Sequence, residues 1–162
     1  MRVLFPGSFD PFTLGHLALV RRAATLFDRV TVGVFHNENK GAGLLAPEER
    51  AELIRLACQG IPQVDVAVSE GFVADFCHRE GISLLIRGIR GEKDLPFEKE
   101  AEAYNRAHGV ETLFFLAEEA SCALSSTEVR RQLSAGGDVS ALMPAGTLEF
   151  LLEKSKKSKN PG

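Results

Sequence analysis

The stretch from Arg2 to Phe27 constrains the fold of this chain more than any other. Residues 2–5 form a short apolar run that is typical of a buried strand, and the Pro-Gly pair that follows is expected to end it. Beyond a turn that contains Pro and Thr, apolar residues recur at helical spacing over residues 17–27. A strand that feeds a helix through such a turn can bind phosphate, because the free first-turn N–H groups and the helix dipole both favour an anion.

Three residues of the turn extend this interpretation. Thr13 is expected to be the N-cap of the helix, which places His16 in its first turn. Gly15 is expected to let a ligand approach the backbone closely, and His16 adds a donor beside the anion. The turn has neither the GxxxxGK[ST] pattern of a P-loop nor the GxGxxG pattern of a dinucleotide-binding fold.

The rest of the chain alternates strand patterns with helical patterns. The expected strands are residues 2–5, 29–35, 64–68, 84–86 and 110–116, and the later helices are residues 47 to about 60, 72–80, 93–107, 126–135 and 144–154. This alternation predicts an α/β fold, a Rossmann-like, doubly wound sheet of about five parallel strands. Ligands of such sheets bind beyond the carboxyl ends of the strands, which selects residues 6–16, 36–45, 69–73, 87–98 and 117–127.

Composition sets the remaining limits. Residues 1–153 are predicted to form one domain, and residues 154–162 a basic, flexible tail. A net charge of −3 is no general reason to expect nucleic-acid or membrane binding, and no apolar run approaches the length of a membrane span. The chain starts directly with a strand pattern, so no signal peptide is expected. Cys58, Cys77 and Cys122 are an odd number at wide spacing, which argues against a disulfide framework or a zinc site and suits a reducing cytoplasm. Cys58 and Cys77 lie in helical patterns and are expected to be small core residues.

The turn also carries a specific resemblance. Residues 7–11 read GSFDP and residues 13–16 read TLGH, which together resemble the nucleotidyltransferase signature G-[ST]-F-D-P followed by [HT]-x-G-H. With Thr at the first position of the second half, the pattern is similar to that of the phosphopantetheine adenylyltransferases, which catalyse the penultimate step of coenzyme A synthesis. The resemblance extends from residue 3 to about residue 150. It implies the reaction ATP + 4′-phosphopantetheine → dephospho-coenzyme A + pyrophosphate.

The resemblance implies a set of site residues. For catalysis it implies His16, which would stabilise the transition state, together with Lys40 and Arg90. For ATP binding it implies Ser8, Phe9, His16, Gly88, Ile89, Arg90, Glu98, Ser121, Cys122, Ala123, Leu124, Ser125, Ser126 and Thr127. For the acceptor substrate it implies Ser8, Lys40, Val73 and Arg87. It implies no protein ligand set for a metal.

The hydrogen-bonding groups of two arginines agree with these assignments. Arg87 and Arg90 flank Gly88 directly after the fourth predicted strand. Arginine offers planar, paired donors that match phosphate oxygens, and a glycine between the two allows close approach of a ligand to the backbone. A pair of solvated surface arginines would give the same pattern. In the resembled family the first arginine contacts the pantetheine substrate and the second contacts the nucleotide.

Residues 123–130 resemble the family's second motif, I-S-S-[ST]-x-[VL]-R. Ser125 and Glu128 also have the spacing of a capping box, and the two interpretations agree because a capped helix N-terminus receives polyphosphate. Ser126 and Thr127 would then face the β- and γ-phosphates. The chain departs from the family twice nearby, with Ser121 in place of a frequent aromatic residue and with Phe97 in place of a frequent tyrosine that could donate a hydrogen bond.

The expected mechanism needs no general base. The acceptor is a phosphate whose second pKa is about 6, so it is already anionic at neutral pH. His16, Lys40 and Arg90 would donate to the α-phosphate while Ser8 orients the acceptor. Mg²⁺ would arrive with ATP on its β- and γ-phosphates, mainly coordinated by water.

The resemblance also implies a homohexamer, and it leaves open whether coenzyme A inhibits the enzyme. Two alternatives stay open. One is a nucleotidyltransferase that acts on nicotinamide mononucleotide or glycerol 3-phosphate, although those families usually carry His at the position of Thr13. The other is a non-catalytic sensor of adenine nucleotides.

Overall fold

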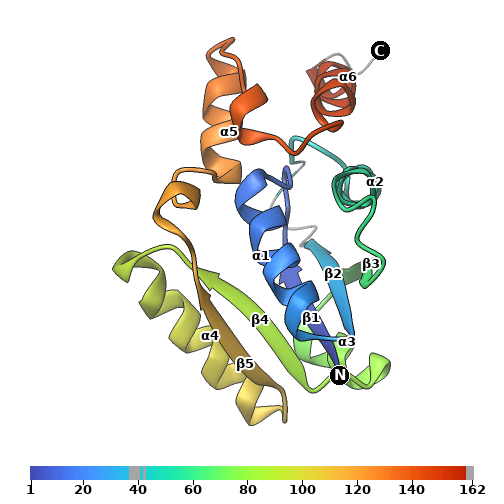
Figure 1. The fold of residues 1–162 in the computed structure, drawn as a ribbon, viewed down its shortest axis with the longest axis vertical. Coiled ribbons are helices and arrows are strands. Elements are labelled where there is room, and N and C mark those ends of the chain that lie inside the picture. The colour runs from blue at the N-terminus through green and yellow to red at the C-terminus, as the bar shows by residue number, and fades with distance from the viewer. Residues whose placement is uncertain (37–40, 42, 160–162) are drawn as a thin grey trace.

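The computed structural model describes residues 1–36, 41 and 43–159. Its centre is a five-stranded sheet in the order β3-β2-β1-β4-β5, and every pair of neighbouring strands is parallel (Figure 1). The strands are β1 (Arg2–Gly7), β2 (Arg29–His36), β3 (Val64–Glu70), β4 (Leu84–Ile89) and β5 (Glu111–Leu116). The strand order reverses between β1 and β4, so the predicted doubly wound α/β fold is confirmed.

In the described part of the chain, six α-helices connect and flank the strands. They are α1 (Leu14–Leu26), α2 (Pro47–Ala57), α3 (Val73–Glu80), α4 (Leu95–Ala107), α5 (Ser126–Ser134) and α6 (Leu148–Lys159). Short 3₁₀ turns precede α4, α5 and α6, namely η2 (Glu92–Asp94), η3 (Glu119–Ser121) and η4 (Ser140–Leu142). Figure 1 shows α5 and α6 together at one end of the molecule, beyond the N-terminal end of α1. In the part of the chain that the structure describes, no helix is both long and apolar enough to span a bilayer.

Alternating strand residues fill two separate cores. Val3 and Ile86 face the larger core, which α1 and α2 complete, whereas Leu4 and Leu85 face a smaller core with Phe76 of α3. This alternation follows from the two-residue period of a strand, because both faces of a parallel sheet are covered by helices. The two thiols expected in the core are buried as predicted, Cys58 in the larger cluster and Cys77 in the smaller.

Four strands run further than the sequence predicts: β2 by one residue, β3 and β1 by two, and β4 by three. β1 continues through Pro6 and Gly7, which pair with Gly33 and Val34 of β2. β4 continues through residues 87–89, which pair with β5, so Arg87 and Gly88 lie in a strand and not in the loop that follows it. The polar side chain of Arg87 is accommodated because it lies at the carboxyl edge of the sheet, beside the switch point.

The C-terminal helix differs most from its prediction. The sequence favours a helix over residues 144–154, but α6 begins at Leu148, after the η4 turn, and continues to Lys159. The predicted boundary between domain and tail at residues 153 and 154 therefore falls inside α6. The added helical turn begins with Ser155, which is buried, and Lys157 within it pairs with Glu153 at 3.4 Å.

Candidate active site

A cleft of about 370 Å³ opens at the switch point between β1 and β4. Its walls come from the turn between β1 and α1, the end of β4 with the η2 turn, and the segment that enters α5. Most of the residues expected to bind substrates line it: Ser8, Phe9, His16, Arg87, Gly88, Arg90, Glu98, Ser121, Leu124, Ser125, Ser126 and Thr127. Segments far apart in the sequence thus converge on one cavity.

His16 lies in the first turn of α1, as predicted, with Thr13 as the N-cap residue. The backbone N–H of Thr13 donates to Nδ1 of His16 at 3.0 Å. Nδ1 is therefore the acceptor nitrogen, and the neutral ring carries its proton on Nε2. Burial lowers the pKa of His16 to about 4, helped by the positive charges of Arg90 and Arg87. At neutral pH the ring is uncharged and presents Nε2–H to the cleft that it lines.

Aromatic rings enclose His16. Phe12 stacks on the imidazole at 5.3 Å between ring centroids, Phe9 meets it edge-on at 5.1 Å, and Phe5 lies 6.3 Å away. Phe9 and Phe12 are both buried, and they shield the imidazole from water. The signature turn thus makes the environment that keeps this histidine neutral.

Arg87 and Arg90 are each held by a carboxylate from the segment that follows β4. Arg87 donates to Glu98 through Nε at 2.9 Å and Nη2 at 2.7 Å. Arg90 pairs with Asp94 through Nε at 3.3 Å, and its backbone N–H donates to the same carboxylate at 2.9 Å. This backbone hydrogen bond is the main reason why the pKa of Asp94 lies below its usual range. No sequence motif marks Asp94, although an acid four residues after an arginine has the i, i+4 spacing of a helical ion pair.

The start of α5 forms only half of the expected capping box. The hydroxyl of Ser125 accepts from the backbone N–H of Glu128 at 3.1 Å. The carboxylate of Glu128 pairs with Arg131 instead of returning to Ser125, because two donors on its own helix face lie closer. The hydroxyl of Ser126 is also committed, since it donates to the carbonyl of Pro11 at 2.7 Å. The first-turn N–H groups are the donors that a helix N-terminus leaves for an anion.

A second cavity of about 420 Å³ lies on the other side of Arg87 and Glu98, which line both. It reaches from Pro6 to α3 and α4, and the residue expected to contact the pantetheine arm, Val73, lines it together with Phe97. Tyr104 and Asn105 of α4 and Thr112 of β5 also line it, and no sequence motif marks these three positions.

Three of the expected site residues that the structure describes line neither of the two cavities. Ile89 is buried in β4, and neither Cys122 nor Ala123 is among the described residues that line the two cavities. The thiol of Cys122 donates a hydrogen bond to the backbone carbonyl of Arg90 at 3.3 Å. Lys40 falls outside the residues that the structure describes.

The two glycines expected to admit a ligand make room for protein atoms instead. A Cβ on Gly15 would lie 2.8 Å from the carbonyl oxygen of Leu124, and a Cβ on Gly88 would lie 2.4 Å from Cδ1 of Leu19. Gly15 thus lets the segment before α5 pack against α1. Gly88 lets α1 pack against β4, although both glycines still line the cleft.

A buried ion pair behind the cleft was also missed. The carboxylate of Asp10 accepts from the backbone N–H groups of Leu44 and Leu45, both at 2.8 Å, and pairs with Arg50 at 3.4 Å. Arg50 also donates to the carbonyl of Ser8 at 3.2 Å. Asp10 of the signature therefore holds the turn between β1 and α1 against the segment before α2. The last Arg of the second motif supports it, since Arg130 donates to the carbonyl of Asp10 at 2.6 Å.

Comparison with known proteins agrees with this site. Residues 4–132 match the family model described as cytidylyltransferase-like, so the chain belongs to this family, and its activity class is nucleotidyl transfer. The fold alone is also similar to the crystal structure of the lipopolysaccharide core biosynthesis protein from Thermoplasma volcanium GSS1. That structure has a TM-score of 0.53 and 20% identity, and the match covers 73% of this chain and 96% of that one.

Curated relatives narrow the family further. The chain is 42% identical over 153 residues to the phosphopantetheine adenylyltransferase of Limosilactobacillus reuteri strain DSM 20016, a match of 93% of this chain and 88% of that protein. It is 43% identical over 159 residues to the enzyme of that name from Frankia alni, with 95% and 98% covered. Within the cytidylyltransferase-like family the chain thus belongs with the phosphopantetheine adenylyltransferases.

Proposed function

We propose that this protein transfers the adenylyl group of ATP to 4′-phosphopantetheine, giving dephospho-coenzyme A and pyrophosphate. One observation carries the proposal. A neutral histidine, two arginines and the N-terminus of α5 converge on one cleft, and a second cavity meets it across Arg87 and Glu98. The first cavity supplies donors for a triphosphate, and the second has room for a flexible arm attached to the acceptor phosphate.

In the reaction, a phosphate oxygen of the acceptor attacks the α-phosphorus of ATP, and the bond from that phosphorus to the bridging oxygen of pyrophosphate breaks. The acceptor is already ionised at neutral pH, so no base has to remove a proton. His16 donates from Nε2 to the α-phosphate as charge develops, with Arg90 and Lys40 as further donors. Ser8 and Arg87 orient the acceptor phosphate in line with the leaving group.

The nucleotide is held by the remaining residues of the cleft. The first-turn N–H groups of Ser126 and Thr127 receive the β- and γ-phosphates at the end of α5, where the helix dipole favours them. The segment of residues 121–124 faces the adenosine. Phe9 and Gly88 shape the floor, and Val73 takes the pantetheine arm in the second cavity.

Mg²⁺ would come with ATP and neutralise charge on the β- and γ-phosphates. The carboxylates of the cleft fit this arrangement, because Asp94 is paired with Arg90 and Glu98 with Arg87. The ion would therefore be held by phosphate and water oxygens rather than by a protein cage, as magnesium commonly is.

Pyrophosphate release from ATP, measured with a panel of acceptors, tests the function. We expect turnover with 4′-phosphopantetheine and none with pantetheine, whose terminal hydroxyl is neutral and has no charge to meet Arg87. Turnover with nicotinamide mononucleotide or glycerol 3-phosphate, and not with phosphopantetheine, would reject the assignment. ATP binding without turnover on any acceptor would favour a nucleotide sensor.

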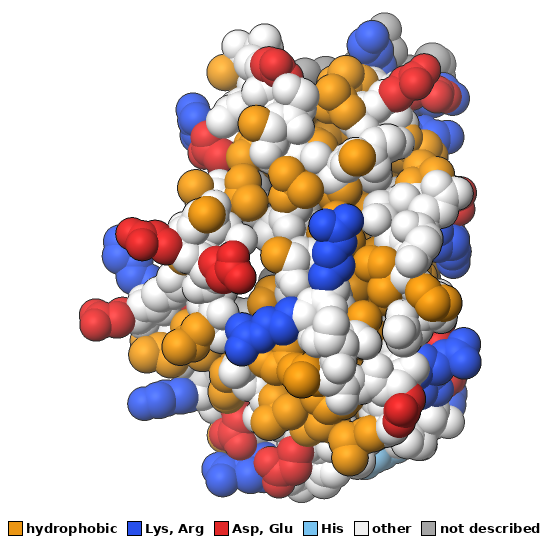
Figure 2. Space-filling view, viewed as in Figure 1, with side chains coloured by type: hydrophobic (Ala, Val, Ile, Leu, Met, Phe, Trp, Pro, Cys, Tyr) orange, Lys and Arg blue, Asp and Glu red, His pale blue; other side chains and the backbone are white. Residues whose placement is uncertain are grey.

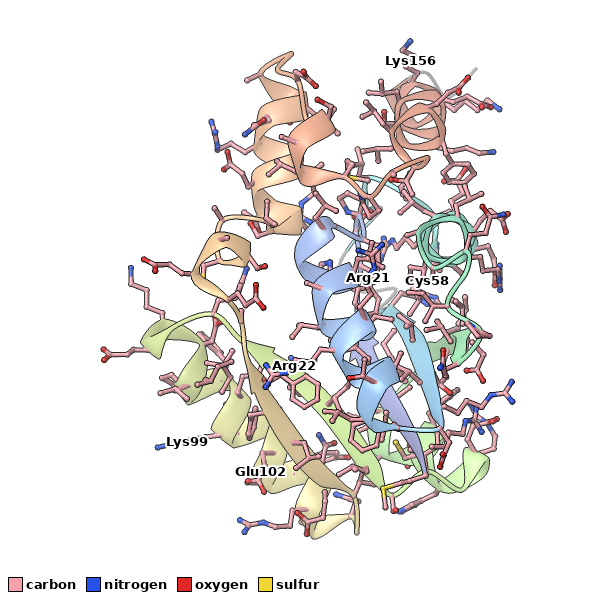
Figure 3. The ribbon with its side chains drawn as sticks, viewed as in Figure 1. Arg21, Arg22, Cys58, Lys99, Glu102 and Lys156 are labelled. Carbon is pink, nitrogen blue, oxygen red and sulfur yellow. The ribbon has the colours of Figure 1, made fainter. Side chains whose placement is uncertain are left out.

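We further propose a homohexamer in the cytoplasm, inhibited by coenzyme A at the same two cavities. An assembly is supported by apolar surface on β5, where Leu113, Phe114 and Leu116 are exposed, and by α4, of whose residues none is buried. Figure 2 shows hydrophobic side chains gathered over β5 and the adjoining end of α1. Arg22 of α1 lies over the ring of Phe115 there (Figure 3). Light scattering of the purified protein tests the hexamer.

A further inference from the structure

Thr13 lies behind the cleft, between α1 and the segment that enters α5. It is the N-cap residue of α1, it is completely buried, and it lines neither of the two cavities. Its backbone N–H donates to Nδ1 of His16 at 3.0 Å, and its hydroxyl donates to the carbonyl of Leu124 at 2.7 Å. The second contact joins positions that are 111 apart in the sequence. Thr13 thus bonds both the histidine of the cleft and the segment expected to face the adenosine.

The single proton of the Thr13 hydroxyl goes to Leu124 and not to His16. Oγ1 of Thr13 lies 3.1 Å from Nδ1 of His16 and 2.7 Å from the carbonyl oxygen of Leu124. Nδ1 already accepts from the backbone N–H of Thr13, whose direction is fixed. In a capping box a Glu or Gln side chain makes this return bond to the N-cap N–H, and here His16 takes that place. The hydroxyl is therefore available to the carbonyl.

The carbonyl of Leu124 packs closely against α1. A Cβ added to Gly15 would lie 2.8 Å from its oxygen. The first backbone hydrogen bond of α5 goes to the carbonyl of Ser125, from the N–H of Val129 at 3.1 Å, so Leu124 precedes the helical ladder. A carbonyl enclosed in this way is costly to leave without a donor. The position of Leu124 against α1 therefore depends on the Thr13 hydroxyl.

Two further hydrogen bonds join the same two parts of the chain. The hydroxyl of Ser126 donates to the carbonyl of Pro11 at 2.7 Å, and Arg130 donates to the carbonyl of Asp10 at 2.6 Å. Both hold α5 to the signature turn. Thr13 adds a direct link to His16, so it opposes a shift of residues 121–124 relative to the imidazole.

We propose that Thr13 is a positioning residue whose hydroxyl keeps residues 121–124 aligned with His16, so that a nucleotide bound against that segment presents its α-phosphate to Nε2. Thr13 itself touches neither substrate. The inference rests on the proposed function, because it takes residues 121–124 as the adenosine contact and His16 as the donor to the α-phosphate. Loss of the hydroxyl should weaken ATP binding and slow the chemical step, and it should leave acceptor binding unchanged.

The test compares Thr13→Ala with Thr13→Ser, because these two variants differ only by the hydroxyl. Pyrophosphate release is measured with ATP and 4′-phosphopantetheine varied in turn, and the Kd for ATP is measured by calorimetry without acceptor. We expect the Kd and the KM for ATP to be about 10-fold higher in Thr13→Ala, the scale for leaving one acceptor unpaired. The KM for phosphopantetheine should differ by less than about 2-fold.

Thr147 provides the matched control. It is also completely buried, it directly precedes α6, and its hydroxyl donates to the carbonyl of Pro144 at 2.8 Å, but it does not line the cleft. The Kd for ATP should differ by less than about 2-fold between Thr147→Ser and Thr147→Ala. Equal effects at the two threonines would overturn the proposal, and so would a KM for phosphopantetheine that rises as much as that for ATP. Should Thr13→Ala fail to fold, Thr13→Val, which keeps the volume, replaces it in the same comparison.

A double-variant cycle tests the link to His16. With His16 present, kcat should be about 10-fold lower in Thr13→Ala than in Thr13→Ser. In a His16→Asn background the difference should fall below about 2-fold, because the donor that the hydroxyl aligns is gone. Equal differences in the two backgrounds would overturn the proposal. Failure of the proposed function is recognised separately, since the unmodified protein would then give no turnover with phosphopantetheine, whereas the calorimetric comparison requires none.

Discussion

Replacing His16 by Asn should flatten the pH dependence of the protein's stability. The folded pKa of His16 is about 4, against 6.5 for a free histidine, so the unfolded chain takes up the proton first. The contribution of the neutral ring to the free energy of unfolding is therefore fully present above pH 6.5. It falls by about 1.4 kcal/mol per pH unit as the pH is lowered from 6.5 toward 4. Between pH 7 and pH 5 this amounts to about 2 kcal/mol, a loss that the Asn variant, with nothing to protonate there, should not show.

Urea unfolding of both proteins at pH 7 and pH 5 measures this difference, because every other titrating group is shared and cancels. An NMR titration of the four histidines should show one ring, absent from the variant, with a midpoint near pH 4. Equal losses of stability in the two proteins, or a His16 midpoint near 6.5, would refute the argument that burial lowers the pKa of His16. The variant should also lower kcat by at least about 10²-fold, the scale for losing one preorganised donor, with little change in ATP binding.

Three further predictions have defined outcomes. Arg87→Ala should mainly raise the KM for phosphopantetheine, whereas Arg90→Ala should mainly depress kcat and weaken ATP binding; steady-state kinetics that show both acting on one substrate would contradict the division. Asp10→Asn should cost about 3–5 kcal/mol in urea unfolding, because it leaves the Arg50 charge buried without its partner. Raising the pH should increase kcat/KM through the acceptor's second pKa, near 6, to a plateau, and His16→Asn should lower that plateau without moving the midpoint.

The sequence alone determined the alternation of elements and the identity of the phosphate-binding turn. These follow from local rules, since strand and helix periods are written in neighbouring residues and the N-cap at Thr13 needs only the turn that contains it. The signature residues at positions 7–16 and the arginines at 87 and 90 could therefore be placed at the carboxyl edge of a parallel sheet before any coordinates. The buried thiols followed from the same patterns.

The tertiary structure decided what each side chain does there. Glu98 meets Arg87, Asp10 meets Arg50, and Gly88 meets Leu19 across long sequence separations, and no local pattern specifies such contacts. The extent of β1 and β4 depends on hydrogen bonds to neighbouring strands, and the extent of α6 on packing that keeps Ser155 buried. The neutral state of His16 is likewise a tertiary property, because it comes from burial among aromatic rings and from two arginines that only the folded chain brings near it.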